Sequence, residues 1–186
     1  MLASRLAMTR YVALLRGVNV SGQNKLPMAD LRARLGDLGH QDVATYIQSG
    51  NVILTARPTG EAAVASAIET EIRRAFKLDV TVLVRTRAQV QKVSTANPFL
   101  KRGGDQSALH VTFLAAAPAR ADVRALSARP PGPDDCAVVG REVYLHCPNG
   151  YGKTKLNNTY LERVLRVPAT TRNWRTVLKL RELLET

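Results

Sequence analysis

The strongest constraint in the sequence is the order of its apolar patterns up to about residue 85. Near-continuous or β-branched apolar runs are typical of buried strands, and apolar residues three or four apart are typical of helices. Ser49–Gly50 separates two such runs and predicts a hairpin turn. The patterns predict a strand at Arg10–Leu15, a helix at 28–38, strands at 43–48 and 51–55, a helix at 64–76, and a strand at Val80–Val84.

This β-α-β-β-α-β order is typical of a ferredoxin-like unit. The second half partly repeats it, because helix and strand patterns alternate in a similar sequence. We expect a helix at 88–95, a strand at 109–114, a helix at 118–127, a hairpin of 137–139 with 143–146, a helix near 156–165, and a last helix from Trp174 to about Leu184. The hairpin turn at Ser49–Gly50 is expected at the sheet end opposite the carboxyl end of the first strand.

The predicted fold class is therefore α+β. A ferredoxin-like βαββαβ N-terminal unit is followed by a second βαββα-type unit with an extra C-terminal helix. The predicted organisation is a disordered leader at residues 1–8, a ferredoxin-like subdomain at 9–85, and a second α/β subdomain at 86–186 that packs against the first.

The chain is strongly basic, with a net charge of +12 and a pI near 10.4. Such an excess favours nucleic acid or an anionic small molecule as partner. No apolar run approaches the ~20 residues that a membrane span requires, and the N-terminus does not resemble a secretory signal. We therefore expect a cytoplasmic protein with no membrane partner, and the sequence leaves its oligomeric state open.

Several unusual segments together resemble one family. The segments are ALLRGVNVSGQNK (13–25), TYIQSGN (45–51), NPF (97–99), TKL (154–156) and ATTRNWRTVLKL (169–180). They are similar to the bacterial proteins grouped as domain of unknown function 1697. The resemblance implies an α/β fold with a ferredoxin-like first part. It implies no activity, so the question of catalysis stays open.

The loop after the first strand is the first candidate ligand site. It lies between a strand and a helix N-terminus, where backbone N–H groups and the helix dipole favour an anion. Its candidate ligand-binding residues are Arg16, Gly17, Asn19, Gly22 and Lys25. The alternative is a structured turn, in which Gly and Asn supply positive φ angles and side-chain bonds to the backbone.

The most basic stretch, Asn149–Arg175, holds the second candidate site. It has six basic residues and one acidic residue, and two helices begin within it. The candidate ligand-binding residues here are Gly152, Lys153, Lys155, Arg172 and Asn173. The alternative is a pair of capped helices with a solvated basic face.

Other chemistry has no support in the sequence. His40, His110 and His146 show no metal-ligand spacing, so no metal site is predicted, and no motif indicates a cofactor. No nucleophile with a paired base stands out. Trp174 is expected to anchor packing of the last helix, although a stacking role is the alternative.

The leading functional hypothesis is a small cytoplasmic protein that binds an anionic ligand, such as a phosphate-bearing one, through loops at helix N-termini. The first alternative is a non-sequence-specific nucleic-acid-binding accessory protein that uses phosphate contacts. The second is a structural or interaction protein without a ligand.

Overall fold

The computed structural model describes residues 8–103, 105–128 and 132–186. The predicted leader at 1–8 lies outside the described residues, except for Met8. The chain forms two compact units. The first unit contains the chain up to Val90 together with Leu180–Thr186, and the second contains Gln91–Lys179. Helices combine with two antiparallel four-stranded sheets, which confirms the α+β class.

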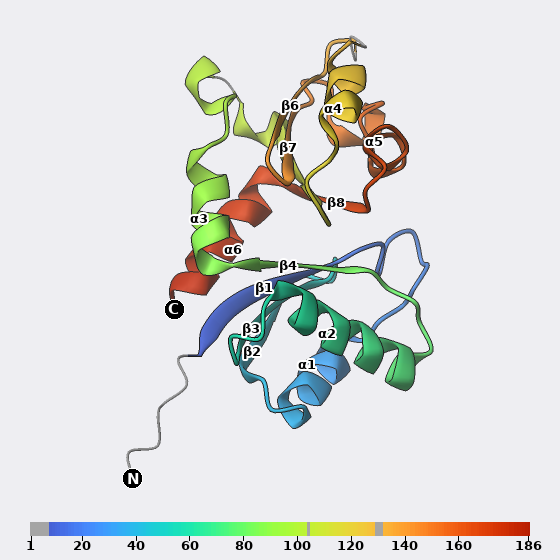
Figure 1. The fold of residues 1–186 in the computed structure, drawn as a ribbon, viewed down its shortest axis with the longest axis vertical. Coiled ribbons are helices and arrows are strands. Elements are labelled where there is room, and N and C mark those ends of the chain that lie inside the picture. Colours follow the sequence, from blue (N-terminus) through green and yellow to red (C-terminus); the bar gives the residue numbers. More distant parts are fainter. Residues whose placement is uncertain (1–7, 104, 129–131) are drawn as a thin grey trace. The chain divides into compact units, whose positions relative to one another are not determined.

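The first unit has the predicted β-α-β-β-α-β order. Its elements are β1 (Thr9–Leu15), α1 (Met28–Asp37), β2 (Gln41–Tyr46), β3 (Asn51–Ala56), α2 (Glu61–Phe76) and β4 (Val82–Thr86), followed by α3 (Arg87–Thr95). The sheet order is β2-β3-β1-β4, with every neighbouring pair antiparallel. Helices α1 and α2 cover one face of this sheet (Figure 1).

Burial on both faces of β1 explains its continuous apolar run. Alternate residues of a strand point to opposite faces. On one face Ala13 and Leu15 pack in a core with Leu31 of α1 and Ile68 of α2, and none of these residues is exposed. Leu14, on the other face, is also fully buried.

The turn between β2 and β3 lies beside the carboxyl end of β1, so the expected placement at the opposite end is wrong. Leu14 pairs with Asn51, and the Leu15 N–H donates to the Gly50 carbonyl at 2.8 Å. Helix α1 carries the chain back, so β2 runs in the same direction as β1. The end of β2, and the turn that follows, therefore lie at the end of the sheet where β1 finishes.

The second unit contains a strand that the sequence analysis did not predict. Its elements are η1 (Leu100–Arg102), η2 (Gln106–Ala108), β5 (Leu109–Leu114), α4 (Arg120–Ser127), β6 (Asp135–Val139), β7 (Glu142–His146), η3 (Tyr151–Lys153), α5 (Asn158–Leu165) and β8 (Ala169–Asn173), and α6 (Trp174–Glu185) begins in it. The unpredicted strand is β8. With it, the sheet order β6-β7-β5-β8 matches that of the first unit.

The two sheets also share a buried arginine at the same structural position. Arg85 in β4 pairs with Val12, and Arg172 in β8 pairs with Val111. Each arginine is next to last in its strand and donates through Nη1 to the carbonyl of the residue before it, at 3.0 and 2.9 Å. The two units therefore repeat one plan, although the sequence shows no repeat.

Replacing Gly50 with alanine should destabilise the protein strongly. Gly50 has φ of +83°, and an added Cβ would lie 2.5 Å from Val18 Cγ2 and 2.8 Å from Leu15 Cβ. We expect a loss of about 2 kcal/mol or more in the free energy of unfolding, measured by urea denaturation.

Gly22→Ala is the matched control. Gly22 has φ of +74°, but nothing lies within 4 Å of an added Cβ, so only the backbone cost of ~1 kcal/mol is expected. Equal losses for the two variants would contradict the close approach of backbone and side chains at Gly50.

Candidate functional site

The asparagines of the loop between β1 and α1 bind the loop itself. The Asn19 amide donates to the Leu26 carbonyl at 2.9 Å and to the Gln48 carbonyl at 2.8 Å, and its oxygen accepts from the Leu26 N–H. Asn24 donates to the Gly17 carbonyl at 3.0 Å. Both amide protons of Asn19 are therefore used inside the protein. These two side chains therefore stabilise a structured turn, which is the alternative to a ligand site. The bond from Asn19 to Gln48 joins this loop to the β2–β3 turn.

The cations of this loop are placed differently. Lys25 is exposed and Arg16 is half-buried, with its backbone N–H bonded to the Thr81 carbonyl at 2.9 Å. Gly17 and Gly22 are exposed and adopt positive φ. Ligand binding by these residues stays a prediction.

The lysines of the second candidate group are exposed at and just after η3. Gly152, Lys153 and Lys155 are exposed, whereas Thr154 between them is buried. The Thr154 hydroxyl donates to Asp134 Oδ2 at 2.6 Å. The hydrogen bond from Thr154 therefore stabilises this segment, and the neighbouring lysines are left exposed to solvent.

Arg172 and Asn173 lie on opposite faces of the second sheet. Arg172 is 7% exposed, and its guanidinium donates to Thr170 Oγ1 at 2.8 Å. Burial lowers the pKa of Arg172 to about 10. Asn173 is exposed and pairs with His110 across the strands. The sequence predicts that the two residues belong to one ligand site. Their side chains point to opposite faces of the sheet, because successive residues of a strand alternate.

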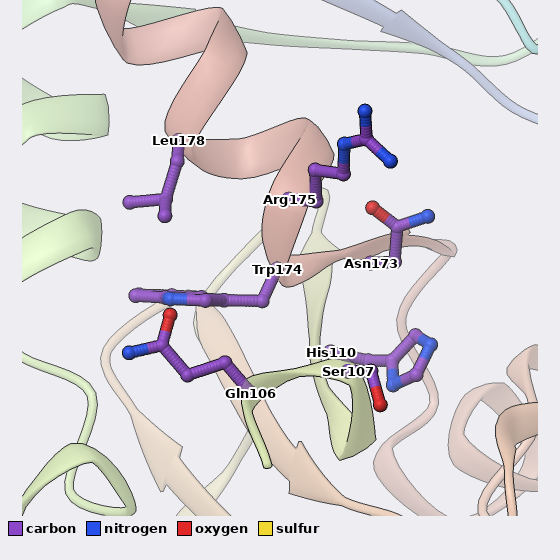
Figure 2. A pocket seen from close by; sticks show the side chains of 7 residues that line it. All are labelled: Gln106, Ser107, His110, Asn173, Trp174, Arg175 and Leu178. Carbon is purple, nitrogen blue, oxygen red and sulfur yellow. The ribbon is translucent and has the colours of Figure 1, made fainter.

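An open cavity lies where Asn173 begins α6. Its volume is about 450 Å³, within the range of small-molecule sites. Side chains from η2, β5, β8 and the first turns of α6 form its wall (Figure 2). The lining residues are Gln106, Ser107, His110, Asn173, Trp174, Arg175 and Leu178.

Pairing of β8 with β5 builds this wall. It sets Asn173 opposite His110. The Asn173 Oδ1 caps α6 by accepting from the Thr176 N–H at 2.8 Å, as the sequence predicts for an N-cap. Arg175 follows one residue into the helix and is exposed. Within the described parts of the chain, no carboxylate pairs with Arg175.

Trp174 is the packing anchor that the sequence predicts. It is 2% exposed. In Figure 2 its indole is seen edge-on, with Leu178 on one side of the ring and Gln106 on the other. The ring therefore contributes little free surface to the cavity, and stacking of a ligand on its face is disfavoured.

His110 is the buried titratable group of the cavity wall. It is 8% exposed, its Nδ1 lies 3.3 Å from the Ala108 carbonyl, and its ring stacks on Tyr151 at 4.8 Å between centroids. Burial lowers the pKa of His110, so the neutral imidazole dominates near pH 7. The sequence alone gives no sign of this role for His110, because its stacking and cross-strand partners are distant in the chain.

The electrostatic character of the cavity comes from Arg175. None of the seven lining residues is acidic. The nearby Asp105 borders an adjoining cavity of about 280 Å³ and accepts from the Ser107 N–H at 2.8 Å and from the Ser107 hydroxyl. Both Ser107 donors are thus used by Asp105.

The part of the chain that the structure describes contains no cluster of three or more His, Cys, Asp or Glu side chains arranged to hold a metal ion. Over the same residues, no helix combines the length and apolarity that crossing a membrane would require.

The family model described as a protein of unknown function, DUF1697, matches residues 8–144. The chain belongs to this family. It is similar in structure to the conserved bacterial protein SP0830 from Streptococcus pneumoniae, with a TM-score of 0.73 and 26% identity over 96% of this chain and 99% of the other. No curated protein matches this DUF1697 chain. The matched range includes the η2 and β5 part of the cavity wall and ends before α6 begins.

The stability of the protein should fall as the pH drops from 7.5 to 5.5, and His110 should contribute to that fall. The folded-state pKa lies below the ordinary value of 6.5, so the unfolded chain takes up the proton first and is favoured as the pH falls. Urea denaturation of His110→Gln should show a smaller loss over this range.

His40→Gln serves as the comparison, because burial also lowers the pKa of His40 and the same sign applies there. Identical pH dependence in wild type and His110→Gln would contradict a buried, neutral His110.

Proposed function

We propose that this DUF1697 protein binds a small anionic ligand in the cavity of its second unit. The observation that carries the proposal is a cavity of metabolite size that has one exposed guanidinium and no carboxylate in its lining. An anion would supply the missing negative charge, whereas a cation would meet only repulsion.

Arg175 is the main charged contact in this proposal. Arg175 is exposed and lines the cavity, and its side chain extends on the side of Asn173 (Figure 2). A guanidinium is a planar fork of donors that suits carboxylate or phosphate oxygens. Because no described carboxylate neutralises it, its interaction with a ligand does not require an existing ion pair to break. The start of α6, a helix of 12 residues with no acidic residue in its first turn, adds a favourable dipole.

Neutral donors complete the proposed site. The Oδ1 atom of Asn173 is engaged as helix cap, which leaves its Nδ2 group to donate to a ligand. Gln106 provides a second amide from η2, on another side of the cavity. These residues suit orientation of a bound anion. The proposal is limited to binding and includes no reaction.

The proposal changes the predicted residue set. Of the residues predicted from sequence, only Asn173 lines the cavity. Arg172 is buried and hydrogen-bonds to Thr170 and Thr171 of its own strand. Lys153 and Lys155 are not among the residues that line the cavity. The proposed class of ligand is the one predicted from the sequence, an anion such as a phosphate-bearing compound.

Arg175→Gln should weaken anion binding at least about tenfold, because charge-assisted hydrogen bonds contribute roughly 1.5–3 kcal/mol each. Isothermal titration or NMR titration with sulfate, phosphate and simple carboxylates at constant ionic strength measures the change. Lys155→Gln is the matched control, since it removes one exposed charge from the same unit and should leave affinity unchanged.

Loss of binding in Lys155→Gln but not in Arg175→Gln would move the site to the loop before α5. Binding only of nucleic acid, with affinity falling steeply as salt rises, would replace the cavity proposal with the nucleic-acid-binding alternative.

A further inference from the structure

We propose that the ligand of this cavity is a monoanion with an apolar body, of which an aromatic or branched aliphatic carboxylate is the chemical class. This inference rests on the proposed function and makes it more specific. It follows from the number of charges in the cavity wall, the geometry of the one cation, and the apolar side chains beside it.

The cavity wall holds one permanent positive charge. Arg175 is the one permanent cation among the seven lining residues. His110 is the other group that could become positive, but it is buried, and none of its partners in the described part of the chain is acidic. It pairs with Leu145 of β7 and Asn173 of β8, and stacks on Tyr151 of η3.

A second positive charge beside Arg175 would thus lack a counter-ion, and burial already lowers the pKa of His110. Near neutral pH the wall therefore offers one full charge. A ligand with one negative charge is neutralised by it. A dianion would bring a second charge into a partly enclosed site with no partner, and desolvation of that charge is costly.

The shape of the cation favours a carboxylate. The guanidinium presents two parallel N–H groups, which match the two oxygens of a carboxylate in one plane. The Nδ2 group of Asn173 can donate a further hydrogen bond to the ligand without adding charge. The neutral His110 uses its one ring proton on the Ala108 carbonyl, so its part in charge specificity is to keep the positive charge of the wall at one.

The remaining wall explains the apolar body. Leu178 is half-buried at the cavity and lies over one face of the Trp174 ring (Figure 2). Burial of apolar ligand surface against such side chains contributes about 25 cal/mol per Å². A cavity of about 450 Å³ holds more than a bare carboxylate or phosphate group.

Three probes with the same benzyl body test the charge. At pH 9 benzyl alcohol is neutral, phenylacetate is a monoanion, and benzylphosphonate is a dianion. Titrations of the full chain at pH 9 and constant ionic strength should show phenylacetate binding at least about tenfold tighter than either of the others. Acetate, which lacks the ring, should also bind at least about tenfold more weakly than phenylacetate.

Two variants tie the result to the cavity. Arg175→Gln should reduce phenylacetate affinity to that of benzyl alcohol, and Lys155→Gln should leave it unchanged. His110→Arg adds a cation that stays protonated even when buried, and it should raise benzylphosphonate affinity relative to phenylacetate. If that variant unfolds, the ranking of the three probes on the wild-type protein still decides the question.

The outcomes separate this inference from the proposed function. Benzylphosphonate binding as tightly as phenylacetate, or acetate binding as tightly, would overturn the monoanion with an apolar body but leave an anion site. Failure of every anion to bind would overturn both.

Discussion

Pairing between β5 and β8 is the interaction on which the second unit and its cavity depend. It sets His110 opposite Asn173, and a hydrogen bond of 2.7 Å between the hydroxyls of Thr112 and Thr171 joins the strands in the same region. Helix α6 begins at the residue after β8, so the strand register also fixes the position of Arg175. A change of one residue in this register would move His110 and Asn173 out of alignment and reverse the faces of β8.

Because the two sheets have the same strand order, equivalent positions in the two units can be compared. In the first sheet Tyr11 pairs with Thr86, and in the second His110 pairs with Asn173 at the equivalent place. Tyr11 is part of the core of its unit, whereas His110 lines a cavity. The buried arginines next to these positions are retained in both sheets. At this position the shared scaffold carries a core residue in one unit and a cavity-lining residue in the other.

Periodicity in the sequence was sufficient for the fold class and most elements, because buried strands and amphipathic helices leave local patterns. It did not reveal β8, whose ATTRN sequence looks like a cap although Thr170 and Arg172 are buried. The site was harder to predict. Asn173 was found from its capping chemistry, while Arg175 counted only toward the charge of the basic stretch 149–175. His110 gave no local signal, because its partners come from η3 and β8. The cavity is made by residues far apart in the chain, and only tertiary structure brings them together.

The most direct test of the account is an NMR titration of the isotope-labelled protein with phenylacetate, following backbone amides and the His110 ring. We predict saturable shifts at Gln106, His110, Asn173 and Arg175, all lost in Arg175→Gln and kept in Lys155→Gln. Shifts confined to residues 16–25 or 152–155, or unchanged shifts in Arg175→Gln, would contradict the conclusion that the cavity of the second unit is the anion-binding site.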